Sequence, residues 1–129
     1  TAQSGFNINL YVKKDSGDPY TGYGIIYDYK DENNYSYFFI RSDGNFLTGR
    51  KFIGQETGND QWVKTKNLLG NGQFDKLNVN RYGTEIHFNI NGEKVATGRY
   101  TPFTGNGIGV FCQKGDQSIL LREISLFQW

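Results

Sequence analysis

Hydrophobic and polar residues alternate with a period of two along most of the chain. This period places successive side chains on opposite faces of a β-strand, so each run predicts a strand with one buried face. The positions expected to point inward are Phe6, Ile8, Leu10 and Val12; Phe38 and Ile40; Leu77 and Val79; Ile86, Phe88 and Ile90; Ile108 and Val110; and Ile119, Leu121, Ile124 and Leu126. Helical periodicity with capping residues is not sustained anywhere, which leaves at most one short helical turn, within residues 61–69.

Turn residues separate these runs at three places. Asp43-Gly44 and Asn91-Gly92 supply residues that tolerate positive φ, as two-residue hairpins require. Residues 31–34 separate an apolar run at 24–29 from one at 35–41 and predict a third hairpin. The pattern therefore predicts an all-β chain of antiparallel strands.

The order of these segments resembles that of concanavalin A-like, laminin-G-like bacterial sandwich domains. The residues that carry the resemblance are Tyr23-Gly24-Ile25-Ile26-Tyr27, Asn34-Tyr35-Ser36-Tyr37-Phe38-Phe39-Ile40, Asp43-Gly44-Asn45-Phe46, Leu77-Asn78-Val79 and the stretch 86–95, followed by 103–109 and 119–127. The resemblance implies a jelly-roll sandwich of two curved antiparallel sheets, with the first and last strands side by side. Such folds carry lectins, carbohydrate-binding modules, glucanases and interaction domains, so the fold alone does not give the function.

Length and charge limit the other classes of protein. The 129 residues suit one domain, and the start at Thr1 without a leader suggests a domain excised from a longer protein. The net charge of +1 offers no broad field for nucleic acid, and no apolar run reaches the length of a membrane-spanning helix. Cys112, the only cysteine, cannot form an internal disulfide and is expected in the core.

Catalytic residues are scarce in the predicted strands. Retaining glycosidases place two carboxylates close together, and here no strand shows two acids at alternate positions. The nearest arrangement is Glu85 with His87, which share one face of a strand but lack an evident third group to orient them. A glycoside hydrolase is therefore the least favoured of the functions considered, and the single histidine excludes a multi-histidine metal site.

Calcium is the one cation for which the sequence offers candidate ligands. Asp28, Asp31 and Asn33, with their neighbours Glu32 and Asn34, place oxygen atoms around one turn, and Asp15, Ser16 and Asp18 do so in another. The alternative is that these are ordinary polar turns, since turns select aspartate and asparagine. No other cofactor is expected.

Strand alternation also predicts which side chains lie outside. If Phe38 and Ile40 point inward, the outer positions of that strand are Tyr35, Tyr37, Phe39 and Arg41, and the same step exposes Asn78, Asn80, Glu85, His87 and Asn89 on two other strands. If these strands belong to one sheet, its outer face combines aromatic rings with amides and suits a neutral glycan. The alternative is that the rings fill strands because they pack well across them.

The leading hypothesis is a noncatalytic, lectin-like carbohydrate-binding module whose ligand meets this outer face. The alternative is a protein-interaction or spacer domain, so the expected partner is a glycan or another protein domain, without nucleic acid or membrane insertion. A lectin-like resemblance favours a secreted or cell-surface location. Trp62 is expected to cap the core, with projection from a loop as the alternative, and Trp129 is expected beside the first strand.

Overall fold

A computed structural model describes residues 4–57, 61–70, 72–103 and 105–129. Strands are the only regular elements in these ranges. They are β1 (Gly5–Gly17), β2 (Tyr23–Asp31), β3 (Asn34–Arg41), β4 (Asn45–Phe52), β5 (Gln55–Thr57), β6 (Val63–Lys64), β7 (Asp75–Tyr82), β8 (Glu85–Ile90), β9 (Glu93–Arg99), β10 (Gly107–Cys112) and β11 (Gln117–Gln128). Residues 61–69 contain the short strand β6, so the one position allowed for a helical turn holds none. No helix in the described ranges has the length and hydropathy to cross a membrane.

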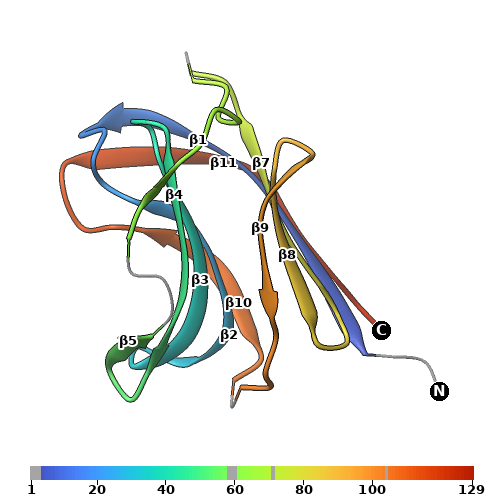
Figure 1. Cartoon of the computed structure of the whole chain (residues 1–129). Coiled ribbons are helices and arrows are strands. Elements are labelled where there is room, and N and C mark those ends of the chain that lie inside the picture. Colours follow the sequence, from blue (N-terminus) through green and yellow to red (C-terminus); the bar gives the residue numbers. More distant parts are fainter. Residues whose placement is uncertain (1–3, 58–60, 71, 104) are drawn as a thin grey trace.

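The strands form two antiparallel sheets packed face to face, as Figure 1 shows. Sheet A has the order β11-β1-β7-β8-β9, and sheet B has the order β10-β2-β3-β4-β5, with β6 also paired to β4. β1 lies between β7 and β11, so the first and last strands are neighbours. The predicted all-β, two-sheet jelly-roll sandwich is confirmed.

The three predicted hairpins are present. Ile90 pairs with Glu93 around Asn91-Gly92, whose φ angles of 53° and 87° are both positive, as a two-residue hairpin requires. Asp31 likewise pairs with Asn34. At Asp43-Gly44 the position of the turn is right but its predicted length is wrong, because Arg41 pairs with Asn45 and the loop has one more residue.

The inward positions of β1, β3, β7 and β8 form the core between the sheets. Ile8, Leu10, Phe38, Val79 and Ile90 are at most 1% exposed. Fully burying one such side chain contributes roughly 1.5–3 kcal/mol to stability, so this core is the main source of stability of the sandwich.

Two predictions about burial are wrong at the side of the sandwich where β10 and β11 end the sheets. Leu121, Ile124 and Leu126 stand opposite Val12, Leu10 and Ile8 but remain exposed, because β11 is an edge strand with no further described strand beside it. Cys112, expected in the core, is exposed at the last position of β10. A residue at the end of an edge strand has neighbours on too few sides to be covered.

Candidate functional site

The outer face of sheet B carries a row of aromatic side chains. Phe38 and Ile40 belong to the core, so Tyr37 and Phe39 project to the opposite side of β3, as alternation predicts. Yet Tyr37 is only 2% exposed and Phe39 only 8%. The expectation that Tyr37 faces water is therefore wrong, although it lies outside the core.

Neighbouring rings cover these two side chains. Tyr37 and Phe39 stack with ring centroids 4.8 Å apart, and Phe39 stacks in turn on Phe111 of β10 at 4.6 Å. Gly24 of β2 lies between Phe39 and Phe111 in the cross-strand register, so the two rings meet above a position without a side chain. The stacked rings form the floor of the outer face.

Gly49 of β4 makes room for the ring of Tyr37. Tyr37 stands opposite Gly49, and a Cβ atom added to that glycine would lie 2.4 Å from Tyr37 Oη and 2.7 Å from Tyr37 Cζ. Such distances are far below a van der Waals contact. A side chain at position 49 would therefore force the Tyr37 ring away from its place in the stack.

A hollow of about 270 Å³ opens on this floor. It is lined by Tyr35, Tyr37, Phe39, Leu47, Glu56, Trp62, Phe111 and Gln113. We call this surface the aromatic face. In Figure 1, β3 and β4 bow toward sheet A at their middle, so the side of sheet B that carries the hollow curves inward.

Trp62 lies at one end of the aromatic face, outside the core that it was expected to cap. Its ring lies over Gly22, where an added Cβ would come within 2.8 Å of it, and the Arg41 guanidinium lies 4.4 Å from its centroid. The ring of Tyr20 lies 5.8 Å from the same guanidinium. Arg41 is therefore held by two aromatic rings, with cation–π attraction to each.

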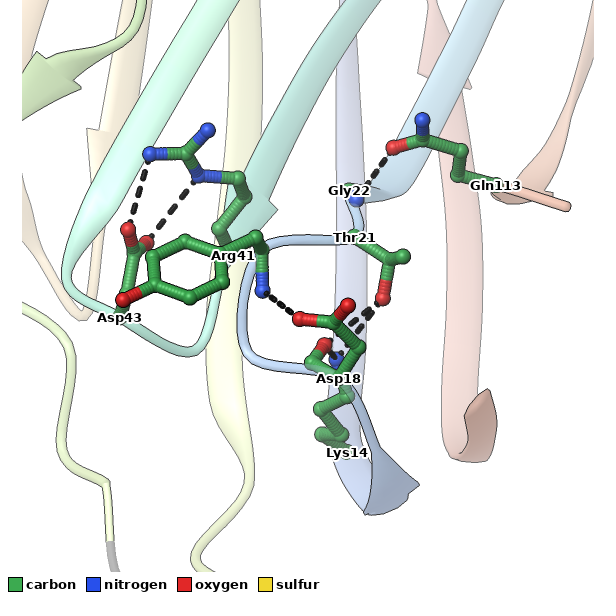
Figure 2. A network of polar contacts seen from close by, with 8 residues as sticks. Lys14, Asp18, Thr21, Gly22, Arg41, Asp43 and Gln113 are labelled. Carbon is green, nitrogen blue, oxygen red and sulfur yellow. Dashed lines mark hydrogen bonds and ion pairs between the residues drawn. The ribbon is translucent and has the colours of Figure 1, made fainter. Parts of the chain in front are cut away.

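Figure 2 shows the polar contacts that order this end of the sandwich. Arg41 donates two hydrogen bonds to the carboxylate of Asp43, at 3.1 and 2.8 Å. Partial burial acts to raise the pKa of Asp43, but hydrogen bonds from Asn45 and Arg41 outweigh it and hold that pKa below its ordinary value. Asp43 therefore stays ionised and fixes the guanidinium beside Trp62.

The loop between β1 and β2 is tied to the same region (Figure 2). Lys14 donates to the carbonyl of Asp18 and to the hydroxyl of Thr21, and the Asp18 carboxylate accepts from the backbone of Tyr20 at 2.8 Å. The side-chain oxygen of Gln113 accepts a 2.7 Å hydrogen bond from the backbone of Gly22. Gln113 is thereby held at the rim of the hollow.

Charged groups stand at the opposite end of the hollow. Lys51 is opposite both Tyr35 and Glu56 in the register, and its Nζ lies 5.8 Å from the Tyr35 ring centroid. Burial, followed by the nearby charge of Glu56, raises the pKa of Tyr35. The Tyr35 hydroxyl therefore remains protonated at neutral pH and can donate a hydrogen bond beside a carboxylate that accepts one.

The other predicted site residues lie on the outer face of sheet A. Asn78 and Asn80 are on β7, and Glu85, His87 and Asn89 are on β8. Sheet A is the opposite layer of the sandwich, so the single aromatic and amide face that was considered does not exist. Tyr35, Tyr37, Phe39 and Arg41 are together on one outer face, and the amides are together on the other.

The amides on sheet A bond to one another. Asn78 Nδ2 donates to the side-chain oxygens of Asn7 and Asn9, at 2.6 and 3.0 Å, and Asn78 Oδ1 accepts from Asn89 at 2.7 Å. We call Asn7, Asn9, Asn78, Asn80, His87 and Asn89 the amide face. Its hydrogen-bonding groups are partly used within the protein, which favours a structural role.

Glu85 and His87 are close, as predicted, but they stand on an open surface. His87 Nε2 lies 3.6 Å from Glu85 Oε2, and the Glu85 side chain is 76% exposed. An exposed pair of this kind contributes little energy, because water solvates both groups.

The calcium candidates do not share one arrangement. Asp28 is buried, accepts a 2.7 Å hydrogen bond from the Tyr100 hydroxyl and lies 3.7 Å from Arg50. Burial raises the pKa of Asp28, whereas the Tyr100 bond and the Arg50 charge act to lower it. Asp31 accepts from the backbone of Asn33 across the β2–β3 turn. Within the described ranges, no three His, Cys, Asp or Glu side chains are grouped as metal ligands, so calcium stays a prediction.

Alternation missed several residues of the aromatic face. Phe111 could have been found, because Ile108 and Val110 inward leave Phe111 outside by the same step that placed Phe39. Glu56, Trp62 and Gln113 carry no such signal, since they lie on short strands or in loops where no period is defined.

Solved structures of other proteins share this β-sandwich fold. The carbohydrate-binding module CBM66 from Bacillus subtilis matches 98% of this chain and 75% of its own at 12% identity, with a TM-score of 0.75. Sheep galectin-11, solved in complex with glycerol, matches 98% of this chain and 91% of its own at 13% identity, with a TM-score of 0.71. The Caenorhabditis elegans galectin LEC-6 matches 95% and 82% at 16% identity, with a TM-score of 0.68. No protein-family model and no curated protein sequence matches the chain.

Proposed function

We propose that this chain is a noncatalytic carbohydrate-binding module whose ligand binds on the aromatic face. The observation that carries the proposal is the hollow of about 270 Å³ above the stacked rings. Aromatic rings cover the apolar C–H faces of a sugar, and a few placed polar groups fix its hydroxyls, which is the usual composition of a small-molecule site. The structural likeness to a carbohydrate-binding module and to galectins supports this class of ligand.

The residues of the aromatic face have different roles in this proposal. Tyr37 and Phe39 are almost fully buried, so they form a rigid floor. Trp62 and Tyr35 are partly exposed at the two ends and supply the rings on which a sugar stacks. Glu56 and Gln113 supply an acceptor and an amide for hydroxyl groups.

A neutral sugar suits this chemistry better than a polyanion. The Arg41 charge is paired with Asp43, and Lys51 stands opposite Glu56 across β4 and β5. The positive groups at the hollow are thus accompanied by carboxylates, and little net charge is left to attract an anion. A more specific resemblance, to concanavalin A-like and laminin-G-like bacterial domains, remains a prediction and does not decide the ligand.

The test is a glycan array followed by titration calorimetry of any sugar that binds, with and without calcium. We expect Trp62→Ala to weaken binding about tenfold, roughly 1.4 kcal/mol, because a stacking ring at the rim is lost. His87→Ala, on the opposite sheet, is the matched control and should leave the affinity unchanged. Absence of binding to any glycan, or equal losses in the two variants, would refute the proposed site.

A further inference from the structure

Strand β11 presents an unusual number of exposed apolar side chains. Leu120, Leu121, Ile124, Leu126 and Phe127 are between 38% and 70% exposed. β11 is also the edge of sheet A, so one side of its backbone has no partner strand among the described residues. A long edge of this kind is a template for pairing with another strand.

The backbone groups that face the free edge can be identified from the ladder with β1. Gly5 and Trp129 exchange two hydrogen bonds, at 3.1 and 3.2 Å, so they form a hydrogen-bonded pair. Such pairs alternate along an antiparallel ladder. The pairs Ile8–Leu126 and Leu10–Ile124 are therefore non-hydrogen-bonded pairs. The backbone N–H and C=O groups of Leu126 and Ile124 point away from β1, to the free edge.

A β-bulge changes this alternation in the middle of the strand. Tyr11 stands opposite Glu123 and Val12 opposite Leu121, so Arg122 is the extra residue of the bulge. On the N-terminal side of the bulge, the backbone groups of Leu121 and Ile119 are the ones that point to the free edge. The two halves of β11 on either side of Arg122 and Glu123 thus present the same arrangement of backbone groups.

The side chains on the two halves complement each other. In an antiparallel pair of β11 strands with a two-fold axis between Arg122 and Glu123, each Arg122 faces a Glu123. By the same register Leu121 faces Ile124. The pairs nearest the axis are thus oppositely charged or both apolar, and each such pair stabilises an antiparallel ladder.

We propose that two copies of this chain form a symmetric dimer through antiparallel pairing of their β11 strands, with Arg122 of one copy opposite Glu123 of the other. A second copy of this chain fits as the partner, because two antiparallel β11 strands place Arg122 and Glu123 opposite each other at both symmetric positions. The two A sheets then join edge to edge into one continuous sheet. Both B sheets lie on the same side of it, so the two aromatic faces are on the same side of the dimer.

The dimer is tested by sedimentation equilibrium over a wide range of protein concentration. A reducing agent is included, because Cys112 is exposed and could otherwise link two copies covalently. We expect a reversible monomer–dimer equilibrium. Sedimentation as a monomer at every concentration would overturn the proposal and would mean that the bulge protects the edge from pairing.

Charge reversal tests the register. Arg122→Glu or Glu123→Arg alone places like charges opposite each other at two symmetric positions, and each should raise the dimer Kd about tenfold. The double variant Arg122→Glu with Glu123→Arg restores opposite charges and should return Kd to that of the unmodified chain. Both residues are exposed, so the circular dichroism spectrum should not change. Failure of the double variant to restore the dimer would contradict this register.

Lys94→Glu and Glu93→Arg provide matched controls. They make the same two reversals on β9, the opposite edge of sheet A, where both residues are exposed. They should leave Kd unchanged. If they weaken the dimer as much as the β11 variants do, the interface lies elsewhere or depends only on net charge. The proposed sugar site plays no part in this result, so either proposal can fail without the other.

Discussion

The two outer faces of the sandwich obey the same alternation but differ in how their side chains are covered. On the aromatic face, Tyr37 and Phe39 project outward and yet are at most 8% exposed, because stacked rings cover one another. On the amide face, Asn78 and Asn89 also project outward, remain partly exposed and bond to each other. An outward position is therefore exposed to water only where the neighbouring side chains leave it uncovered. The aromatic face adds a second, smaller core, whereas the amide face adds a network of hydrogen bonds.

The largest expected effect comes from breaking the aromatic floor. Phe39→Ala removes the ring between Tyr37 and Phe111 and should lower the free energy of unfolding by about 3 kcal/mol, as for a core phenylalanine. Phe127→Ala, which removes a ring that is 70% exposed, should change it by less than about 0.5 kcal/mol. Denaturation in urea measures both. Equal and small losses would show that the stacked rings are not a second core.

Gly49→Ala tests the same floor from the opposite strand. The new Cβ atom would meet the Tyr37 ring and should lower stability by roughly 1–3 kcal/mol, the usual range for overpacking. Gly98→Ala on β9 is the control, because its Cβ would lie 3.6 Å from the nearest atom, an ordinary contact. Thermal unfolding should separate the two variants. A Gly49→Ala protein as stable as the Gly98→Ala protein would mean that the Tyr37 ring moves without cost.

On the amide face, Asn78→Ala should lower the free energy of unfolding by less than Phe39→Ala does. It removes a donor to Asn7 and Asn9 and an acceptor for Asn89, at a surface where water can partly replace them. We expect a loss of about 1–2 kcal/mol in urea denaturation. His87→Ala, which removes only an exposed contact to Glu85, should stay within about 0.5 kcal/mol. A larger loss of stability for His87→Ala than for Asn78→Ala would contradict the conclusion that hydrogen bonds between amides stabilise this face.

The smallest effect concerns pH at the end of the aromatic face. The pKa of Asp43 is lower in the folded chain than its ordinary value of about 3.9, so its contribution to stability is full above that pH and is lost as pH falls through the folded pKa. Protonation releases Arg41 from Asp43 beside the Trp62 ring. In a Trp129→Phe background, Trp62 fluorescence should therefore change only in the acid range. Asp43→Asn should remove that transition, and its persistence would assign the change to another group.

Alternation predicted the strands and the inner and outer sides of most of them. Phe38, Val79 and Phe88 are buried as expected, and so their neighbours along the strand lie outside. It could not predict which strands share a sheet, because pairing depends on contacts between residues distant in the sequence. For that reason Tyr35 and His87 were considered for one face and lie on two. That residues 1–129 form one domain of a longer protein remains a prediction.

Other failures have local physical causes. Trp62 and Glu56 lie where no strand is long enough to define a period, so nothing indicated that they flank the hollow. Leu126 occupies an inward position, as predicted, but it lies on an edge strand, where an inward side chain can still be exposed to solvent. Charge and composition only made some classes of partner less expected, and they placed no side chain.

The pairing of β1 with β11 has a consequence for the order in which the molecule can assemble on the ribosome. β1 leaves the ribosome first among the described strands, but its neighbours in sheet A are β7 and β11, which are made much later. Sheet B pairs β2, β3 and β4 in the order of synthesis, so those hairpins can close early. Until residues 117–128 emerge, one side of β1 has no neighbour, and this unpaired edge leaves the nascent chain open to aggregation.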